Sequence, residues 1–292
     1  MTQGGAIPLW QRRSVHHMVL MAVTYFLVLG GLVVLMIPFG WMISTSLKTL
    51  QEAFAFPPTW IPNPIRWRNY PDSWNYMPFT LYLRNTVIIT ATSMIGQVAS
   101  ASLVAYAFAR MRAPGRDLLF MIVLGTMMLP AQVTMIPRFI LFKYLGWFNT
   151  FKPLIVPFYF GGGAFAIFLL RQFYMTLPLE LDDAATIDGC GRFGIFWRII
   201  LPLSKPALGT IAIFAFFWRW NDLMGPLIYL RSHNLRTLAL GLTYFRDETG
   251  QTMVPWNLLM AVSLLVALPC LLVFFFFQRS FVQGIALTGI KG

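Results

Sequence analysis

Six long apolar runs interrupt this chain, and they constrain its fold more than any other feature of the sequence. A helix needs about 20 consecutive apolar residues to cross the hydrocarbon core of a bilayer. Because backbone polar groups find no water there, such runs form helices rather than loops. We therefore predict an all-α, polytopic membrane protein with six transmembrane helices. They are expected over residues 18–43, 85–109, 118–141, 153–174, 207–230 and 258–277.

The composition excludes several classes of function. Charged residues make up 11% of the chain, against about 25% in a typical soluble domain. The formal charge of +12 comes from Lys and Arg scattered over nearly every segment between the runs, whereas a nucleic-acid face would gather them. Two cysteines and three histidines show no metal-ligand spacing. We expect no nucleic-acid partner, no metal and no catalytic site.

The segments between the runs predict which ends of the helices face the cytoplasm. Short loops rich in Lys and Arg stay on the cytoplasmic side, and such clusters occur at Arg12 and Arg13 and again at residues 110–117. Both clusters place the two termini in the cytoplasm. The expected division is a cytoplasmic segment, a transmembrane domain with two outer loops and a cytoplasmic tail, over residues 1–17, 18–283 (outer loops 49–79 and 232–256) and 284–292.

A polar island at residues 179–193, "LELDDAATIDGCGRF", separates the fourth and fifth runs. Four of the ten acidic residues of the chain lie in the nine positions from Glu180 to Asp188. Apolar residues recur there at helical spacing up to Gly189, a residue typical of the left-handed cap that ends a helix. A second helical face follows, made of Phe193, Phe196, Trp197 and Ile200. We predict a cytoplasmic helix-turn-helix over residues 178–205.

Two interpretations of this island stay open on physical grounds. Catalysis would need a base, a nucleophile or a metal partner beside the acids, and the sequence arranges none there. A plain connector would not need an exposed aromatic face, which is unfavourable in water. A docking element for a cytoplasmic partner accounts for the acids, the glycine turn and the aromatic residues together.

The island and four further stretches resemble one family of membrane proteins. "DDAATIDGCGRFGIFWRIILPLSKP" is similar to the cytoplasmic EAA loop in permease subunits of bacterial ABC importers. "YAFAR" at 106–110, "FLLRQF" at 168–173, "WNDL" at 220–223 and the terminal "GIALTGIKG" are similar to the carbohydrate-importing, MalG-like subgroup. Asp183 stands where the family has Glu, and Cys190 where it has a small Ala. The carboxylate is retained, so docking is expected to be kept.

The resemblance implies a mechanism in which this chain catalyses nothing. In the family, the loop inserts into a cleft of an ATPase subunit, and closure of two such subunits rocks the helices between inward-facing and outward-facing states. ATP and Mg²⁺ are bound by those partners, so we expect no cofactor in this chain. The residues implied in coupling are Asp183, Ala184, Ala185, Asp188, Gly189, Phe193, Phe196, Leu201 and Pro202.

The resemblance also implies partners and a location. A second homologous permease, two ATPase subunits and an extracellular or periplasmic sugar-binding protein would complete an importer of a sugar or oligosaccharide in the lipid of the bacterial cytoplasmic membrane. The outer loop 232–256 would engage the binding protein or be a solvated connection, and the tail 284–292 would reach the ATPase subunits. Glycerol phosphate or another polyol derivative is the alternative cargo. An ion-driven secondary transporter is the alternative machine.

A polar patch within the fifth run is the candidate substrate path. Its residues are Trp218, Trp220, Asn221 and Asp222. The indoles could stack on a sugar ring, while the amide and the carboxylate could bond its hydroxyls. Alternatively, Arg219 and Asp222, three positions apart on a helix, satisfy each other inside the bundle. Elsewhere, Gly161, Gly162 and Gly163 lack the context of a phosphate loop, and we expect local unwinding or close helix packing there.

Overall fold

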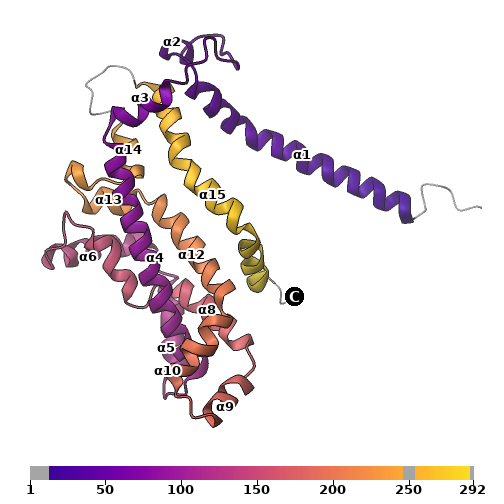
Figure 1. Ribbon diagram of the computed structural model, residues 1–292, viewed down its shortest axis with the longest axis vertical. Helices are drawn as coiled ribbons and strands as arrows, with labels where there is room; N and C mark the ends of the chain where they lie inside the picture. The colour runs from indigo at the N-terminus through magenta and orange to yellow at the C-terminus, as the bar shows by residue number, and fades with distance from the viewer. Residues whose placement is uncertain (1–12, 246–253, 290–292) are drawn as a thin grey trace, which may run out of the picture. The chain divides into compact units, whose positions relative to one another are not determined.

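The computed structural model describes residues 13–245 and 254–289, and this part of the chain is helical with no strand. Figure 1 shows the helices in chain order. They are α1 (Arg13–Ser46), α2 (Leu50–Ala53), α3 (Asn69–Tyr76), α4 (Phe79–Arg110), α5 (Arg116–Thr126), α6 (Ala131–Tyr144), α7 (Lys152–Ile155), η2 (Val156–Tyr159), α8 (Ala164–Thr176), α9 (Glu180–Ile187), α10 (Arg192–Ile195), η3 (Phe196–Ile200), α11 (Leu201–Leu203), α12 (Lys205–Trp220), α13 (Met224–Tyr229), η4 (His233–Leu235), α14 (Leu238–Tyr244) and α15 (Trp256–Gly289). The predicted all-α membrane fold is confirmed.

Four of these segments are long and apolar enough to cross a membrane, and two bent pairs raise the number to six. The four are His17–Ser46, Phe79–Arg110, Lys152–Thr176 and Trp256–Gln278. The third predicted run is a bent pair, in which α5 and α6 meet at 99°. Pro130 precedes α6, and a proline disfavours helical backbone in the residue before it. The fifth run belongs to the other bent pair, which turns by 75°.

The first compact unit contains, of the described residues, 13–73 and 255–264. All side chains of α1 from residue 17 to 38 are exposed, so its apolar surface suits lipid or a partner chain. The segment after α1, which was predicted as part of the outer loop 49–79, is not entirely irregular, because it contains α2 and the start of α3. Asn69 donates to the carbonyls of Ser46 (2.9 Å) and Lys48 (2.7 Å), which ties this segment to the end of α1.

The second compact unit contains, of the described residues, 74–245, 254 and 265–289, and it is built around α4. Helix α4 packs along both α8 and α12 (Figure 1). Small buried residues at this contact, Ala101 and Ala105 on α4 and Ala166 on α8, have no exposed surface. Small side chains let membrane helices approach closely, which supplies the packing that lipid cannot.

The span over residues 152–176 is broken between η2 and α8. Gly161, Gly162 and Gly163 have φ of 88°, 67° and 94°, values that favour glycine. A Cβ on Gly162 would lie 2.5 Å from the carbonyl oxygen of Gln97 and 2.8 Å from Cβ of Ala101 on α4. The expected unwinding and close packing at this triplet are both confirmed. Non-helical backbone inside a membrane is tolerated where protein covers it.

Candidate functional site

The predicted helix-turn-helix is present within residues 178–205 and turns at Gly189. Helix α9 ends in a Schellman motif, because the N–H of Gly189 donates to the carbonyl of Thr186 (3.0 Å) and the N–H of Cys190 donates to the carbonyl of Ala185 (2.8 Å). Gly189 has a φ of 80°, a conformation that costs other L-residues about 1–2 kcal/mol. This glycine therefore sets the angle between α9 and α10.

We predict that Gly189→Ala loosens the helix-turn-helix. A Cβ at this position meets no atom within 4 Å, so the change adds backbone strain and no clash. A cost of about 1 kcal/mol corresponds to roughly 5-fold faster amide hydrogen exchange over α9 and α10. Gly191→Ala is the matched control, because Gly191 has a φ of −70° that alanine adopts freely. Equal exchange in the two variants would contradict the role given to the left-handed cap.

Arg110, the last residue of α4, holds this helix-turn-helix against the membrane helices. Its Nη2 donates to the carbonyls of Tyr174 and Leu177 at the end of α8, both at 2.7 Å. Its Nη1 lies 3.4 Å from the carboxylate of Asp182 in α9, and the two side chains are 2% and 19% exposed. Burial raises the pKa of the Asp182 carboxyl; the Arg110 charge opposes this and Asp183 adds to it. Arg110 therefore stabilises the charged form of this carboxyl against the effect of burial.

Tyr106 forms the second anchor, one helical turn before Arg110. Its hydroxyl donates to the carbonyl of Arg192 at the start of α10 (3.0 Å), and its ring lies 5.1 Å from that of Phe196. Phe196 is 1% exposed and belongs to the core. The expectation of an exposed Phe196 is therefore wrong, because its ring packs against α4 inside the chain. In the sequence, Tyr106 and Arg110 stand together in the "YAFAR" stretch that resembles the family, without an anchoring role of their own. Their i, i+4 spacing is the physical signal that could have indicated a shared face.

The opposite side of the helix-turn-helix faces away from the membrane helices and is exposed. Ile187 is 86% exposed, and Phe193 and Trp197 are 65% and 54% exposed. The predicted coupling residues divide between the two sides. Asp183, Ala184, Asp188, Gly189, Phe193 and Pro202 are exposed, Leu201 is half-buried, and Ala185 and Phe196 are buried. This surface thus combines isolated carboxylates with large apolar side chains.

The polar patch of the fifth run does not form one site. Trp220 is buried and donates through Nε1 to the carbonyl of Val266 in α15 (3.0 Å), so its indole holds two helices together. Asp222 accepts from the N–H of Gly225 (3.0 Å) at the start of α13. Trp218 and Asn221 are exposed. Arg219 and Asp222 form no ion pair within 4.0 Å in the described structure, so the expected mutual pairing is absent.

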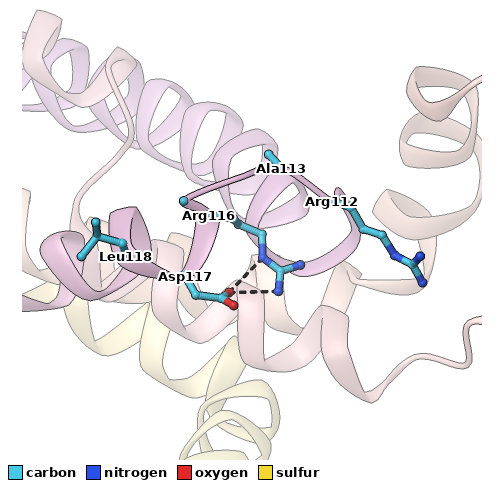
Figure 2. A pocket seen from close by; sticks show the side chains of 6 residues that line it. Arg112, Ala113, Arg116, Asp117 and Leu118 are labelled. Atoms are coloured by element: carbon cyan, nitrogen blue, oxygen red, sulfur yellow. Dashed lines mark hydrogen bonds and ion pairs between the residues drawn. The ribbon is translucent and has the colours of Figure 1, made fainter.

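Arg112 and Arg116 form a basic cluster at the turn between α4 and α5. It lines an open cavity of about 260 Å³ together with Ala113, Gly115 and Leu118. Figure 2 shows Arg116 directed at Asp117, while Arg112 points away from them. The closest approach of Arg116 to Asp117 is 2.9 Å, and their side chains are 29% and 73% exposed. Exposed pairs of this kind contribute about 0–1 kcal/mol, so this turn does not anchor the helix-turn-helix.

Three predicted regions lie partly outside the described residues: positions 1–12 of the N-terminal segment, including Arg12, 246–253 of the outer loop and 290–292 of the tail. The start of the outer loop packs on α4, where Asn85 donates to the carbonyls of Asn234 (2.8 Å) and Arg236 (2.9 Å). Thr86 accepts from the N–H of Leu238 (2.9 Å). This stretch of the loop is therefore fixed near the start of α4, opposite the end that carries Arg110.

Residues 97–287 match the family model described as "Binding-protein-dependent transport system inner membrane component". The chain is 34% identical to the probable ABC transporter permease protein YurM of Bacillus subtilis, over 89% of this chain and 85% of that protein. It is 35% identical to the sn-glycerol-3-phosphate transport system permease protein UgpE of Pectobacterium atrosepticum, over 89% and 93%.

One solved structure has the same fold. It is the crystal structure of a bacterial ABC transporter involved in the import of the acidic polysaccharide alginate, with a TM-score of 0.82 and 22% identity. The match covers 94% of this chain and 100% of the other. Together with the family match and the anchored helix-turn-helix, this settles what kind of protein the chain is. It belongs to the family of binding-protein-dependent transport system inner membrane components, the non-catalytic permease subunits of ABC transporters.

Proposed function

We propose that this chain and a second homologous permease form the translocation path of an ATP-driven importer of a carbohydrate or a polyol derivative. The residues near Gly189 dock on an ATPase subunit. The relatives support this cargo class, since one is named for sn-glycerol 3-phosphate and the structural neighbour imports alginate. ATP and Mg²⁺ bind to the two ATPase subunits, and a sugar-binding protein delivers the cargo on the outer side.

The observation that carries this proposal is the two-sided construction of the helix-turn-helix. Its inner side is joined to α4 through Tyr106 and Arg110. Its outer side exposes Asp183, Ile187 and Phe193, although exposed large apolar groups are unfavourable in water. A partner surface that covers them removes this apolar area from water. The docked element therefore moves as one piece with the ends of α4 and α8.

The same arrangement supports a topology. Arg110, Arg112 and Arg116 lie at the end of α4 that contacts the helix-turn-helix, and short basic segments stay in the cytoplasm. Both termini then face the cytoplasm, and residues 232–256 face outward toward the binding protein. The location that we propose is the bacterial cytoplasmic membrane, because cytoplasmic ATPases can reach the loop of an importer there.

We predict that Ile187→Glu removes the ATPase subunit from the complex. The change places a charge in an interface that must exclude water. In a mild-detergent purification of the tagged chain from its own host, ATPase recovery should fall at least about 10-fold, or about 1.4 kcal/mol. The second permease should remain. Tyr144→Glu is the matched control, because Tyr144 at the end of α6 is 87% exposed. Wild-type chain that retains no ATPase, or Ile187→Glu chain that retains it fully, would contradict the proposal.

A further inference from the structure

Arg219 lies deep in the membrane-spanning part of the second unit. It is about 21 Å along α12 from Lys205, at about 1.5 Å per residue. The hydrocarbon core of a bilayer is about 30 Å thick, and Lys205 follows the cytoplasmic loop directly. Arg219 is therefore a cation held well inside the bilayer, where ionisable side chains are unfavourable and mark functional pathways.

The contacts of Arg219 position the guanidinium without neutralising it. Its Nη2 donates to Oε1 of Gln97 on α4 (2.9 Å). Its Cζ lies 3.5 Å from the ring centroid of Phe158 in η2. Its Nε is buried and meets no acceptor among the described residues. No carboxylate of the described chain lies within 4.0 Å, since Asp222 is turned toward Gly225. The charge thus has no carboxylate in direct contact, and Asp222 attracts it only from beyond 4.0 Å.

A purely structural role would not require this charge. Gln97 could bond an uncharged amide, and Phe158 could pack on any flat side chain. Arg171, another arginine packed on a ring in the same unit, lies near the cytoplasmic end of α8 and donates to the carbonyl of Phe108 (3.4 Å). At that depth a long cationic side chain reaches the headgroups. Arg219 lies too deep to reach the headgroups, so an anion from outside the chain would be a suitable partner for its charge.

We propose that Arg219 recognises an anionic group of the transported substrate, a phosphate monoester or a carboxylate. This inference rests on the proposed importer function and narrows its substrate class to anionic carbohydrates or polyols. A guanidinium binds either group with two parallel hydrogen bonds. Gln97 and Phe158 fix the plane of the guanidinium, and its buried Nε has no partner among the described residues that would compete with an anion. Trp218 and Asn221, exposed beside it on α12, offer stacking and hydrogen bonding to the rest of the substrate.

The test uses the complete importer in proteoliposomes with internal ATP. Three probes are compared: sn-glycerol 3-phosphate, an oligouronate and neutral maltose. We expect one of the two anionic probes to be taken up at least about 10-fold faster than maltose. The identity of that probe distinguishes a phosphate substrate from a carboxylate substrate. Arg219→Gln should lower this uptake at least about 10-fold. Arg219→Lys should keep an intermediate rate. Arg171→Gln, the matched control, should keep uptake within about 2-fold of wild type.

Uptake of maltose alone overturns the anion assignment and leaves the importer function standing. Anion uptake that is indifferent to Arg219→Gln also overturns it, as does an equal loss of charged and neutral uptake. An importer that assembles without an ATPase subunit would instead refute the proposed function itself. If the importer with Arg219→Gln does not assemble, Gln97→Leu serves as the second variant. It keeps the charge of Arg219 and removes the hydrogen bond that orients its guanidinium. We expect that variant to raise KM for the anionic probe more than it lowers kcat, and an unchanged KM would count against the proposal.

Discussion

Arg110→Met is expected to separate the helix-turn-helix from the transmembrane helices. It removes two hydrogen bonds of 2.7 Å and leaves the carboxylate of Asp182 without its cation. Removing one partner of a buried ion pair costs about 3–5 kcal/mol, and the partial exposure of Asp182 places the expected cost near the lower end. The complex should show a lower apparent melting temperature in detergent, together with ATP hydrolysis that no longer drives uptake.

Arg116→Met is the matched control for this change. Arg116 also forms an arginine–aspartate pair at the same end of α4, but this pair is exposed. Its loss should change stability by less than about 1 kcal/mol. Adding Asp182→Asn to Arg110→Met should recover part of the loss, because the buried charge disappears. If Arg110→Met and Arg116→Met behave alike, Arg110 does not anchor the helix-turn-helix.

Gly162→Ala is expected to destabilise the second compact unit, because Gly162 combines a left-handed φ with a close approach to the backbone of α4. Alanine at a φ of 67° is strained, which costs about 1–2 kcal/mol. Its Cβ would also approach Ala101 and the carbonyl of Gln97 on α4 too closely, and overpacking adds about 1–3 kcal/mol. The break in the span could not pack against α4. Thermal unfolding and uptake should both show the loss.

Gly161→Ala separates the two causes. Gly161 has a similar φ of 88°, but the nearest atom to its Cβ is a side-chain atom of Ile167 at 3.9 Å. It should therefore show the backbone strain alone, and Gly162→Ala should be worse by the cost of the clash. Equal loss in the two variants would mean that close approach of the triplet to α4 does not matter.

These sites share one helix. On α4, Gln97 holds Arg219, Ala101 faces the glycine break, and Tyr106 and Arg110 hold the helix-turn-helix. A helix is stiff along its axis because each backbone hydrogen bond spans one turn. Movement of a docked ATPase against Arg110 would therefore reach the depth of Gln97 directly. If an ATPase docks as proposed, α4 would be the mechanical link between coupling and the translocation path.

Long-range contacts changed several sequence-based expectations. Periodicity predicted one exposed aromatic face of the island, but only Phe193 and Trp197 are exposed, whereas Ile200 is buried and Phe196 packs against Tyr106. Arg219 and Asp222 have the right spacing to pair. Instead, Arg219 donates a hydrogen bond to Gln97, and Asp222 accepts one from the N–H of Gly225 near the start of α13. The third run has enough apolar residues for a straight span, but the break before Pro130 bends it.

The sequence by itself determined the helical membrane fold, the helix-turn-helix and its glycine turn, because these depend on local quantities: run length, periodicity and the φ that only glycine adopts readily. It also carried the family, through motifs that stand in order along the chain. Only the tertiary structure decided which face of the island is free and which residues hold it. It alone showed that Arg219 forms no direct ion pair with the described residues. Such facts depend on residues far apart in sequence, such as Arg110 with Asp182 and Gln97 with Arg219, whose contacts no local pattern encodes.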